Sequence, residues 1–151
     1  YITIPGIFLI KIRFLDNGPF LIAYYIFVIK STDIGAYLVG MKFGRHPLIP
    51  RISPGKSLEG FIGGMIFSVA AAYLGSFFVG VILPQHIAII GLILGICAQF
   101  GDLAESVLKR DAGVKDSGLV FPGLGGVLDL VDSLLIAVPF YYLYIDIFII
   151  R

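Results

Sequence analysis

The strongest constraint on the fold is an apolar run at residues 61–83, which contains 23 residues and no charged side chain. A helix needs about 20 mostly apolar residues to cross a bilayer. The run therefore predicts a transmembrane helix, and Gly63, Gly64, Gly75 and Gly80 predict close packing against other helices. The whole chain is 58% hydrophobic and 14% charged, whereas soluble domains usually carry about 25% charged residues. We therefore expect a membrane protein.

Other apolar stretches extend this pattern. Residues 86–108 and 133–150 are long enough to span a membrane, and residues 20–41 form a further span that a polar segment at 30–33 interrupts. Residues 1–15 are too short and too charged for a complete span. We predict an all-α fold: a polytopic transmembrane bundle of four to five helices joined by polar loops.

Two long polar loops carry most of the basic residues. They cover residues 42–59 and 109–132, whereas the short turn at 84–85 has no lysine or arginine. Basic residues concentrate in cytoplasmic loops of membrane proteins. Both long loops are therefore predicted to lie on the cytoplasmic side.

Ionisable residues inside the spans are costly in lipid and indicate function when they face the bundle interior. The acids of this kind are Asp33, Asp102 and Glu105. In the segment GDLAESVLKR, a helix would place Asp102, Glu105, Ser106 and Lys109 on one face. This stripe is either part of a functional site or an internal salt bridge that only neutralises charge.

A second acidic pair, Asp129 and Asp132, lies three residues apart, with Ser133 beside it. Two neighbouring carboxylates repel one another unless a cation lies between them. Oxygen ligands of this kind suit Mg²⁺, which often takes one or two carboxylates together with substrate phosphates. The alternative is a helix N-cap, which the pair taken alone would favour. The second acidic face at 102–105 raises the probability of a metal site.

The loop between these acidic segments has residues suited to phosphate. Its cations are Lys109, Arg110 and Lys115, and the glycines Gly123, Gly125 and Gly126 permit close approach of a ligand to the backbone. A flexible turn would also explain the glycines. In the other loop, Ser53, Lys56 and Glu59 are explained either by turn and capping chemistry or by contacts with an anion.

Taken together, these motifs resemble the phosphatidate cytidylyltransferase (CDP-diacylglycerol synthase) family over roughly residues 20–140. The segments STDIGAYLVGMKFGRH, ISPGKSLEGFIGG and GDLAES look like the family. So does its C-terminal signature, matched here by Ser106, Lys109, Arg110, Lys115, Asp116, Ser117, Gly118, Pro122, Gly123, Gly125, Gly126, Asp129, Asp132 and Ser133. Two positions depart from it, because Leu124 and Leu130 stand where the family has histidine and arginine.

The resemblance implies transfer of the cytidylyl group of CTP to phosphatidate in the membrane, giving CDP-diacylglycerol and pyrophosphate for phospholipid synthesis. It implies Mg²⁺ held by Asp102, Asp129 and Asp132, with a second cation left open. The catalytic residues it implies are Lys109, Arg110, Lys115, Asp116 and Asp132. Those implied to bind substrate are Asp33, Ser53, Lys56, Glu59, Ser106, Ser117, Gly123, Gly125 and Gly126.

The same resemblance sets the expected context. We expect residues 1–151 to be one membrane-embedded catalytic domain, forming a C-terminal portion of a longer protein of the bacterial inner membrane, with its active site on the cytoplasmic side. We expect no nucleic-acid partner and allow a homodimer, for which residues 60–64 offer a small-residue face.

Four other interpretations of the function remain. The chain could use another lipid acceptor, or be a polyprenol-type kinase. It could also be a catalytically impaired relative, because of Leu124 and Leu130. The fourth interpretation is a transporter or an ion-conducting bundle, since buried acids also mark ion pathways. The acids of this chain, however, gather beside a glycine-rich basic loop instead of spreading through the membrane depth.

Overall fold

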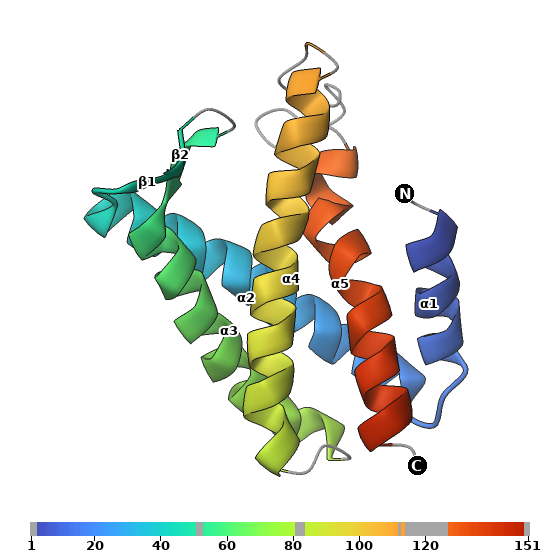
Figure 1. Cartoon of the computed structure of the whole chain (residues 1–151). Coiled ribbons are helices and arrows are strands. Elements are labelled where there is room, and N and C mark those ends of the chain that lie inside the picture. The colour runs from blue at the N-terminus through green and yellow to red at the C-terminus, as the bar shows by residue number, and fades with distance from the viewer. Residues whose placement is uncertain (1–2, 51–52, 81–83, 112, 114–126, 150–151) are drawn as a thin grey trace.

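The computed structural model describes residues 3–50, 53–80, 84–111, 113 and 127–149. Within them the chain forms five helices and one hairpin (Figure 1). The elements, in chain order, are α1 (Thr3–Arg13), α2 (Gly18–Phe43), β1 (Pro47–Ile49), β2 (Ser53–Ser57), α3 (Leu58–Val79), α4 (Pro84–Asp111) and α5 (Val127–Phe148). The predicted all-α membrane bundle is confirmed.

Helix length and composition identify the spans. In the described part of the chain, α2, α3 and α4 are each long and apolar enough to cross a membrane, and α5 contributes the shorter apolar stretch Ser133–Phe148. The polar segment at 30–33 does not break α2, which continues for 26 residues. The Thr32 hydroxyl donates to the carbonyl of Val28 within the same helix, so this polar group needs no water.

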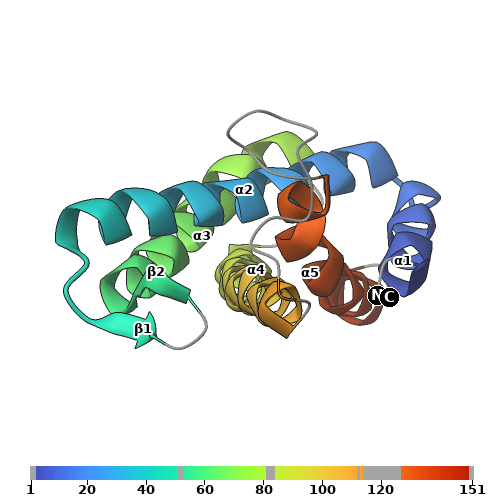
Figure 2. The same cartoon turned by 90° about the horizontal axis from the view of Figure 1, so that it is seen from above.

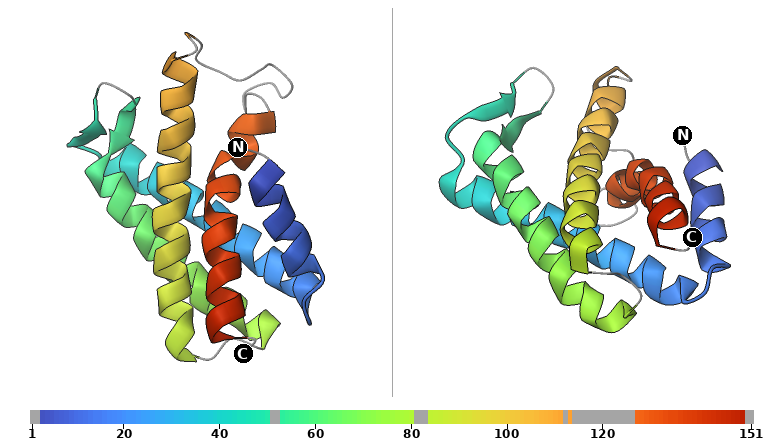
Figure 3. Two further views of the ribbon diagram at one scale, coloured as in Figure 1. Left: turned by 45° about the vertical axis from the view of Figure 1, so that its right-hand side comes forward. Right: turned by 60° about the horizontal axis from the view of Figure 1, so that its bottom comes forward.

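The helices do not run parallel. Seen from above, α2 extends across the bundle, with α3 packed along it and with α4 and α5 standing beside its middle (Figure 2). Helix α1 packs against α5 and the start of α2. The end of α2, the hairpin, the start of α3, the end of α4 and the start of α5 all lie at one end of the molecule, called here the polar end (Figures 1 and 3).

Small residues bring α2 and α3 close together, as the sequence predicted for Gly63. A Cβ atom added to Gly63 would lie 2.5 Å from the Cβ of Val39, and one added to Gly60 would lie 2.8 Å from the carbonyl oxygen of Ala36. The small-residue face at 60–64 is therefore covered by α2 of the same chain, not left open for another subunit. Gly80 has a different role from the packing role predicted for it. It follows α3 with a φ of 64°, and among the described residues no atom outside its chain neighbours lies within 4 Å of its Cβ position.

The loop predicted at 42–59 contains the antiparallel hairpin of β1 and β2. Its strands are three and five residues long. After the hairpin, the Ser57 side chain caps α3 by accepting a hydrogen bond of 3.1 Å from the backbone N–H of Gly60. This cap sets the direction in which β2 enters α3, and so places the residue before it, Lys56.

Candidate active site

A cavity of about 530 Å³ lies at the polar end of the molecule. Its walls come from α2, the hairpin, the first turn of α3 and residues 99–103 of α4. The polar side chains in these walls are Asp33, Tyr37, Lys56, Ser57, Gln99 and Asp102. The cavity therefore combines two carboxylates, a lysine and neutral hydrogen-bonding groups within an otherwise apolar bundle.

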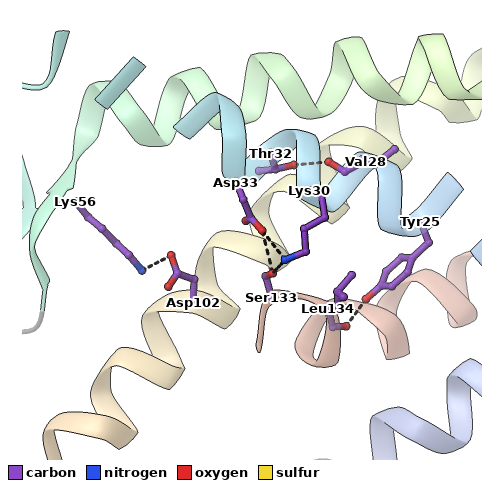
Figure 4. Close-up of polar contacts among 9 residues, drawn as sticks. All are labelled: Tyr25, Val28, Lys30, Thr32, Asp33, Lys56, Asp102, Ser133 and Leu134. Carbon is purple, nitrogen blue, oxygen red and sulfur yellow. Dashed lines mark hydrogen bonds and ion pairs between the residues drawn. The ribbon is translucent and has the colours of Figure 1, made fainter. Parts of the chain in front are cut away.

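An ion pair between the hairpin and α4 lies in the cavity wall. The Nζ atom of Lys56 lies 2.6 Å from Oδ2 of Asp102 (Figure 4). The Lys56 side chain is 24% exposed and that of Asp102 is 46% exposed. The pair thus joins two elements that are distant in sequence, and its carboxylate remains accessible to a ligand.

The hairpin that carries Lys56 is held by Glu59. One carboxylate oxygen of Glu59 accepts hydrogen bonds of 3.0 and 3.2 Å from the backbone N–H groups of Arg45 and His46. The other oxygen lies 2.6 Å from Nδ1 of His46. Glu59, predicted to bind substrate, contacts the turn before β1 and is absent from the cavity walls. Ser53, the other predicted residue in this hairpin, begins β2 and is also absent from them.

A second polar cluster joins α2 to α5. Oδ2 of Asp33 lies 3.0 Å from Nζ of Lys30 and accepts a hydrogen bond of 3.3 Å from the Ser133 hydroxyl (Figure 4). Nζ of Lys30 is also 3.5 Å from the Ser133 Oγ. Ser133 is buried, and one residue further on the Tyr25 hydroxyl donates to the carbonyl of Leu134. The start of α5 is therefore tied to the middle of α2 beside the cavity.

The polar stripe predicted on α4 is only partly a shared site. Lys109 pairs with Glu105 at 3.5 Å, one helical turn away, and the Glu105 side chain is almost fully buried. Ser106 donates to the backbone carbonyl of Asp102 within the helix. For Glu105 and Lys109 the internal salt bridge considered from the sequence is therefore observed, whereas Asp102 turns to Lys56. Arg110 is exposed near the end of α4.

The remaining predicted site residues lie wholly or partly outside the described structure. Asp129 and Asp132 belong to the first turns of α5, but their side chains are not described. Outside the described residues altogether lie Lys115, Asp116, Ser117, Gly123, Gly125 and Gly126, as does Leu124.

The cavity contains two carboxylates, which are the kind of ligand that a hard divalent cation prefers. Among the described residues no group of three or more acidic, histidine or cysteine side chains could hold a metal. The cavity nevertheless offers the carboxylate of Asp102 from α4, and a bound nucleotide would add phosphate oxygens. Mg²⁺ is commonly held by one or two carboxylates together with such phosphates and water. In the described part of the chain, the cavity thus offers such a cation one carboxylate, which is paired with Lys56.

Sequence reasoning missed three polar residues at this site, namely Lys30, Tyr37 and Gln99. In the sequence Lys30 interrupts an apolar span, but a lysine three residues before an aspartate can also pair with it on a helix. Gln99 lies one turn before Asp102 in an apolar stretch and donates a hydrogen bond of 3.0 Å to the carbonyl of Phe61. Because Gln99 lies one helical turn before Asp102, the spacing of these two polar residues could have predicted that they line the same cavity.

Comparison with known proteins identifies the family. A family profile described as the cytidylyltransferase family matches residues 1–148. The chain belongs to the cytidylyltransferase family. It is 41% identical to the phosphatidate cytidylyltransferase of Bacillus subtilis, over 98% of this chain and 58% of that protein. The resemblance seen in the sequence is thereby confirmed.

Two further relatives carry the same name. Identity to the phosphatidate cytidylyltransferase of Haemophilus influenzae is 44%, over 83% of this chain and 45% of the relative. For that of Staphylococcus haemolyticus it is 45%, over 82% and 48%. This member of the cytidylyltransferase family thus spans about half the length of the curated relatives it matches.

Proposed function

We propose that this chain carries the active site of a membrane-bound phosphatidate cytidylyltransferase. The observation that supports this most is the cavity at the polar end, where Asp102 and Lys56 from separate elements meet beside Asp33 and Gln99. A carboxylate, an ammonium group and neutral donors at the edge of a membrane bundle suit a water-soluble nucleotide that reacts with a lipid phosphate. The relatives are named phosphatidate cytidylyltransferase, which supports phosphatidate as the acceptor and a cytidine nucleotide, here CTP, as the donor.

In the proposed reaction, a phosphate oxygen of phosphatidate attacks the α-phosphorus of CTP. A new bond forms between that oxygen and the α-phosphorus, and the bond from the α-phosphorus to the oxygen bridging to the β-phosphorus breaks. The products are CDP-diacylglycerol and pyrophosphate. Because both reactants are anions, positioning and charge neutralisation supply most of the catalysis.

The described residues would serve these needs in different ways. Lys56 would contact the phosphates of CTP, because its ammonium lies in the cavity wall on a short hairpin and can exchange Asp102 for a phosphate oxygen. Tyr37 and Gln99 would donate or accept hydrogen bonds to the neutral parts of the nucleotide. Lys109 and Arg110, at the end of α4, would contact the lipid headgroup or the triphosphate.

Mg²⁺ is part of the proposal. Asp102 would hold it, together with Asp129 and Asp132 of α5, and the cation would neutralise charge on the phosphates. The helix α5 that carries the two latter residues is tied to the cavity through Ser133, which follows Asp132 directly.

The polar end is proposed to face the cytoplasm of a bacterial inner membrane. The basic residues at this end are Lys42, Arg45, Lys56, Lys109 and Arg110. The opposite end has fewer, namely Lys11 and Arg13 in the last turn of α1 (Figure 1). Such an excess of basic residues favours the cytoplasmic side. In this position CTP could enter from the cytosol while phosphatidate stays anchored in its leaflet.

The proposal is tested with purified protein in lipid nanodiscs, supplied with CTP labelled in the α-phosphate, with Mg²⁺ and with one acceptor lipid at a time. We expect label in CDP-diacylglycerol only when phosphatidate is present, with one pyrophosphate released per product. Transfer of label to a different lipid phosphate, with none to phosphatidate, would assign the site to another acceptor. Consumption of CTP with release of CDP would indicate a kinase instead.

A further inference from the structure

Lys56 lies on an irregular part of the hairpin. The two strands pair at two positions, Pro47 with Ser57 and Ile49 with Ser53. Between these pairs β1 has one residue but β2 has three, the last of which is Lys56. Extra residues make a strand bulge, and bulges near active sites often direct a side chain. Lys56 is not itself a paired position, so its place in the cavity wall depends on how the base of the hairpin is held.

Glu59, in the first turn of α3, holds that base. Its carboxylate accepts hydrogen bonds of 3.0 and 3.2 Å from the backbone N–H groups of Arg45 and His46, and it lies 2.6 Å from Nδ1 of His46. The carbonyl of His46 in turn accepts a hydrogen bond of 2.9 Å from the N–H of Leu58. The turn before β1 and the start of α3 are therefore joined by four polar contacts, three of which involve the Glu59 side chain.

The base of the hairpin is also packed tightly against the end of α2. A Cβ atom added to Gly44, which follows α2, would lie 2.8 Å from Oγ of Ser57, and one added to Gly60 would lie 3.1 Å from the same oxygen. Ser57 directly follows Lys56 and caps α3. The residue beside Lys56 thus has little room to move unless α2 or α3 moves with it, so the base is a fixed junction and not a hinge.

From these contacts we infer that Glu59 is a positioning residue for the binding of CTP. It acts through the backbone of residues 45–46, holds the hairpin in place, and so fixes the point from which the Lys56 side chain enters the cavity. Lys56 then exchanges Asp102 for a phosphate oxygen by rotation of its own side chain, without movement of the hairpin. This step rests on the proposed function. Misplacing a binding group by about 1 Å can cost about 100-fold in rate, so a fixed base matters for this contact.

The geometry distinguishes this role from a direct contact with substrate or metal. Glu59 faces the turn at 45–46 and is absent from the cavity walls, so it supplies hydrogen-bond acceptors to the turn. Glutamine has the same length, keeps an oxygen for both N–H groups and can donate to a neutral His46 ring. Aspartate keeps the charge, but its carboxylate lies further back by one carbon–carbon bond, about 1.5 Å. A positioning role therefore predicts that Glu59→Gln behaves like wild type and that Glu59→Asp behaves like Glu59→Ala.

The first test is kinetic and uses the full chain in nanodiscs with labelled CTP and phosphatidate. Glu59→Ala is expected to raise the KM for CTP about tenfold, as for loss of one hydrogen bond to a charged group, while kcat and the KM for phosphatidate stay within about twofold of wild type. The double variant Glu59→Ala with Lys56→Met should have the KM of Lys56→Met alone, because both changes remove the same contact. Asp16→Ala is the control and should change none of these values, because Asp16 is exposed in the turn between α1 and α2, which lies at the opposite end of the molecule (Figure 1).

The second test does not depend on turnover. It measures amide hydrogen exchange at the backbone N–H groups of Arg45, His46 and Leu58 without nucleotide. Glu59→Ala and Glu59→Asp should speed this exchange about tenfold or more, whereas Glu59→Gln and Lys56→Met should leave it within about twofold of wild type. Adding CTP to wild type should also leave it within about twofold, because the hairpin does not move. Circular dichroism and elution volume establish that each variant is folded, and Glu59→Asp carries both tests if Glu59→Ala does not fold.

Three results would overturn the inference. One is a Glu59→Gln variant whose KM for CTP rises as much as that of Glu59→Ala, and another is a folded Glu59→Ala variant with the wild-type KM. The third is an additive double variant, with a KM about 100-fold above wild type. Failure of the proposed function looks different. In that case the wild-type protein makes no labelled lipid from CTP and phosphatidate, while the exchange rates still separate Glu59→Ala from Glu59→Gln.

Discussion

Replacing Lys56 by methionine should strengthen divalent cation binding in the absence of nucleotide. Methionine keeps most of the length and apolar stem of lysine and removes only the ammonium. In the protein without ligands that ammonium lies 2.6 Å from Oδ2 of Asp102, so a cation arriving at Asp102 must displace it. Without the ammonium, this competition disappears and the carboxylate is available at once.

The size of the effect follows from the geometry of the pair. Two unit charges about 4 Å apart interact by about 4 kcal/mol at an effective dielectric constant of 20 and by about 1 kcal/mol in water. The Asp102 side chain is 46% exposed, so solvent screens the pair and the value lies toward the lower limit. We expect about 1–2 kcal/mol, which corresponds to Mn²⁺ binding about 5- to 30-fold tighter in Lys56→Met than in wild type.

The assay is a Mn²⁺ titration followed by electron paramagnetic resonance, repeated with CTP present. When CTP is present, Lys56→Met should no longer bind Mn²⁺ more tightly than wild type, because the variant lacks a contact with the nucleotide phosphates. Its KM for CTP should rise about tenfold. Lys42→Met is a suitable control, since Lys42 is exposed at the end of α2 and outside the cavity walls. A folded Lys56→Met variant with unchanged or weaker Mn²⁺ binding would refute the idea that the lysine and the cation compete for Asp102.

Three other variants test separate parts of the account. Asp129→Asn should lower kcat by about 100-fold or more, as for loss of a group that stabilises charge on the reacting phosphates. Membrane insertion and elution volume should stay unchanged. Near-normal transfer by this variant would mean that Asp129 is not part of the site. Leu124→His combined with Leu130→Arg should raise kcat/KM in the transfer assay, and no gain would mean that these leucines do not limit activity. Gly63→Leu should destabilise the protein by about 1–3 kcal/mol or more in thermal or denaturant unfolding, because its side chain would overlap Val39; a stable variant would contradict the close α2–α3 packing.

The membrane helices could be predicted from the sequence because length and apolar composition nearly determine a span. The continuity of α2 could not, because Lys30 and Asp33 look like a break unless their pairing along the helix is considered. The hairpin could not be predicted from the sequence either. The sequence SPGKS contains proline and glycine and has no alternation of apolar residues, and the turn before β1 is held by Glu59 from beyond the hairpin.

Of the predicted site residues, Asp33, Lys56 and Asp102 line the described cavity, but their partners could not be predicted from the sequence. Helical spacing grouped Asp102 with Lys109, and this spacing is real, yet Lys109 pairs with Glu105 and Asp102 pairs with Lys56. The two residues of the latter pair are separated by all of α3 and the first part of α4, and they meet only in the folded bundle. The same is true of Asp33 and Ser133, which come together because α5 returns to the middle of α2.

The central claim is that the cytidylyl group of CTP is transferred to phosphatidate in the cavity containing Asp102. It is tested most directly by measuring formation of CDP-diacylglycerol from labelled CTP and phosphatidate in nanodiscs, for wild type and for Asp102→Asn of equal thermal stability. We predict Mg²⁺-dependent product from wild type and a loss of about 100-fold or more in the variant. Equal rates for the two proteins, or no CDP-diacylglycerol from wild type, would contradict the claim.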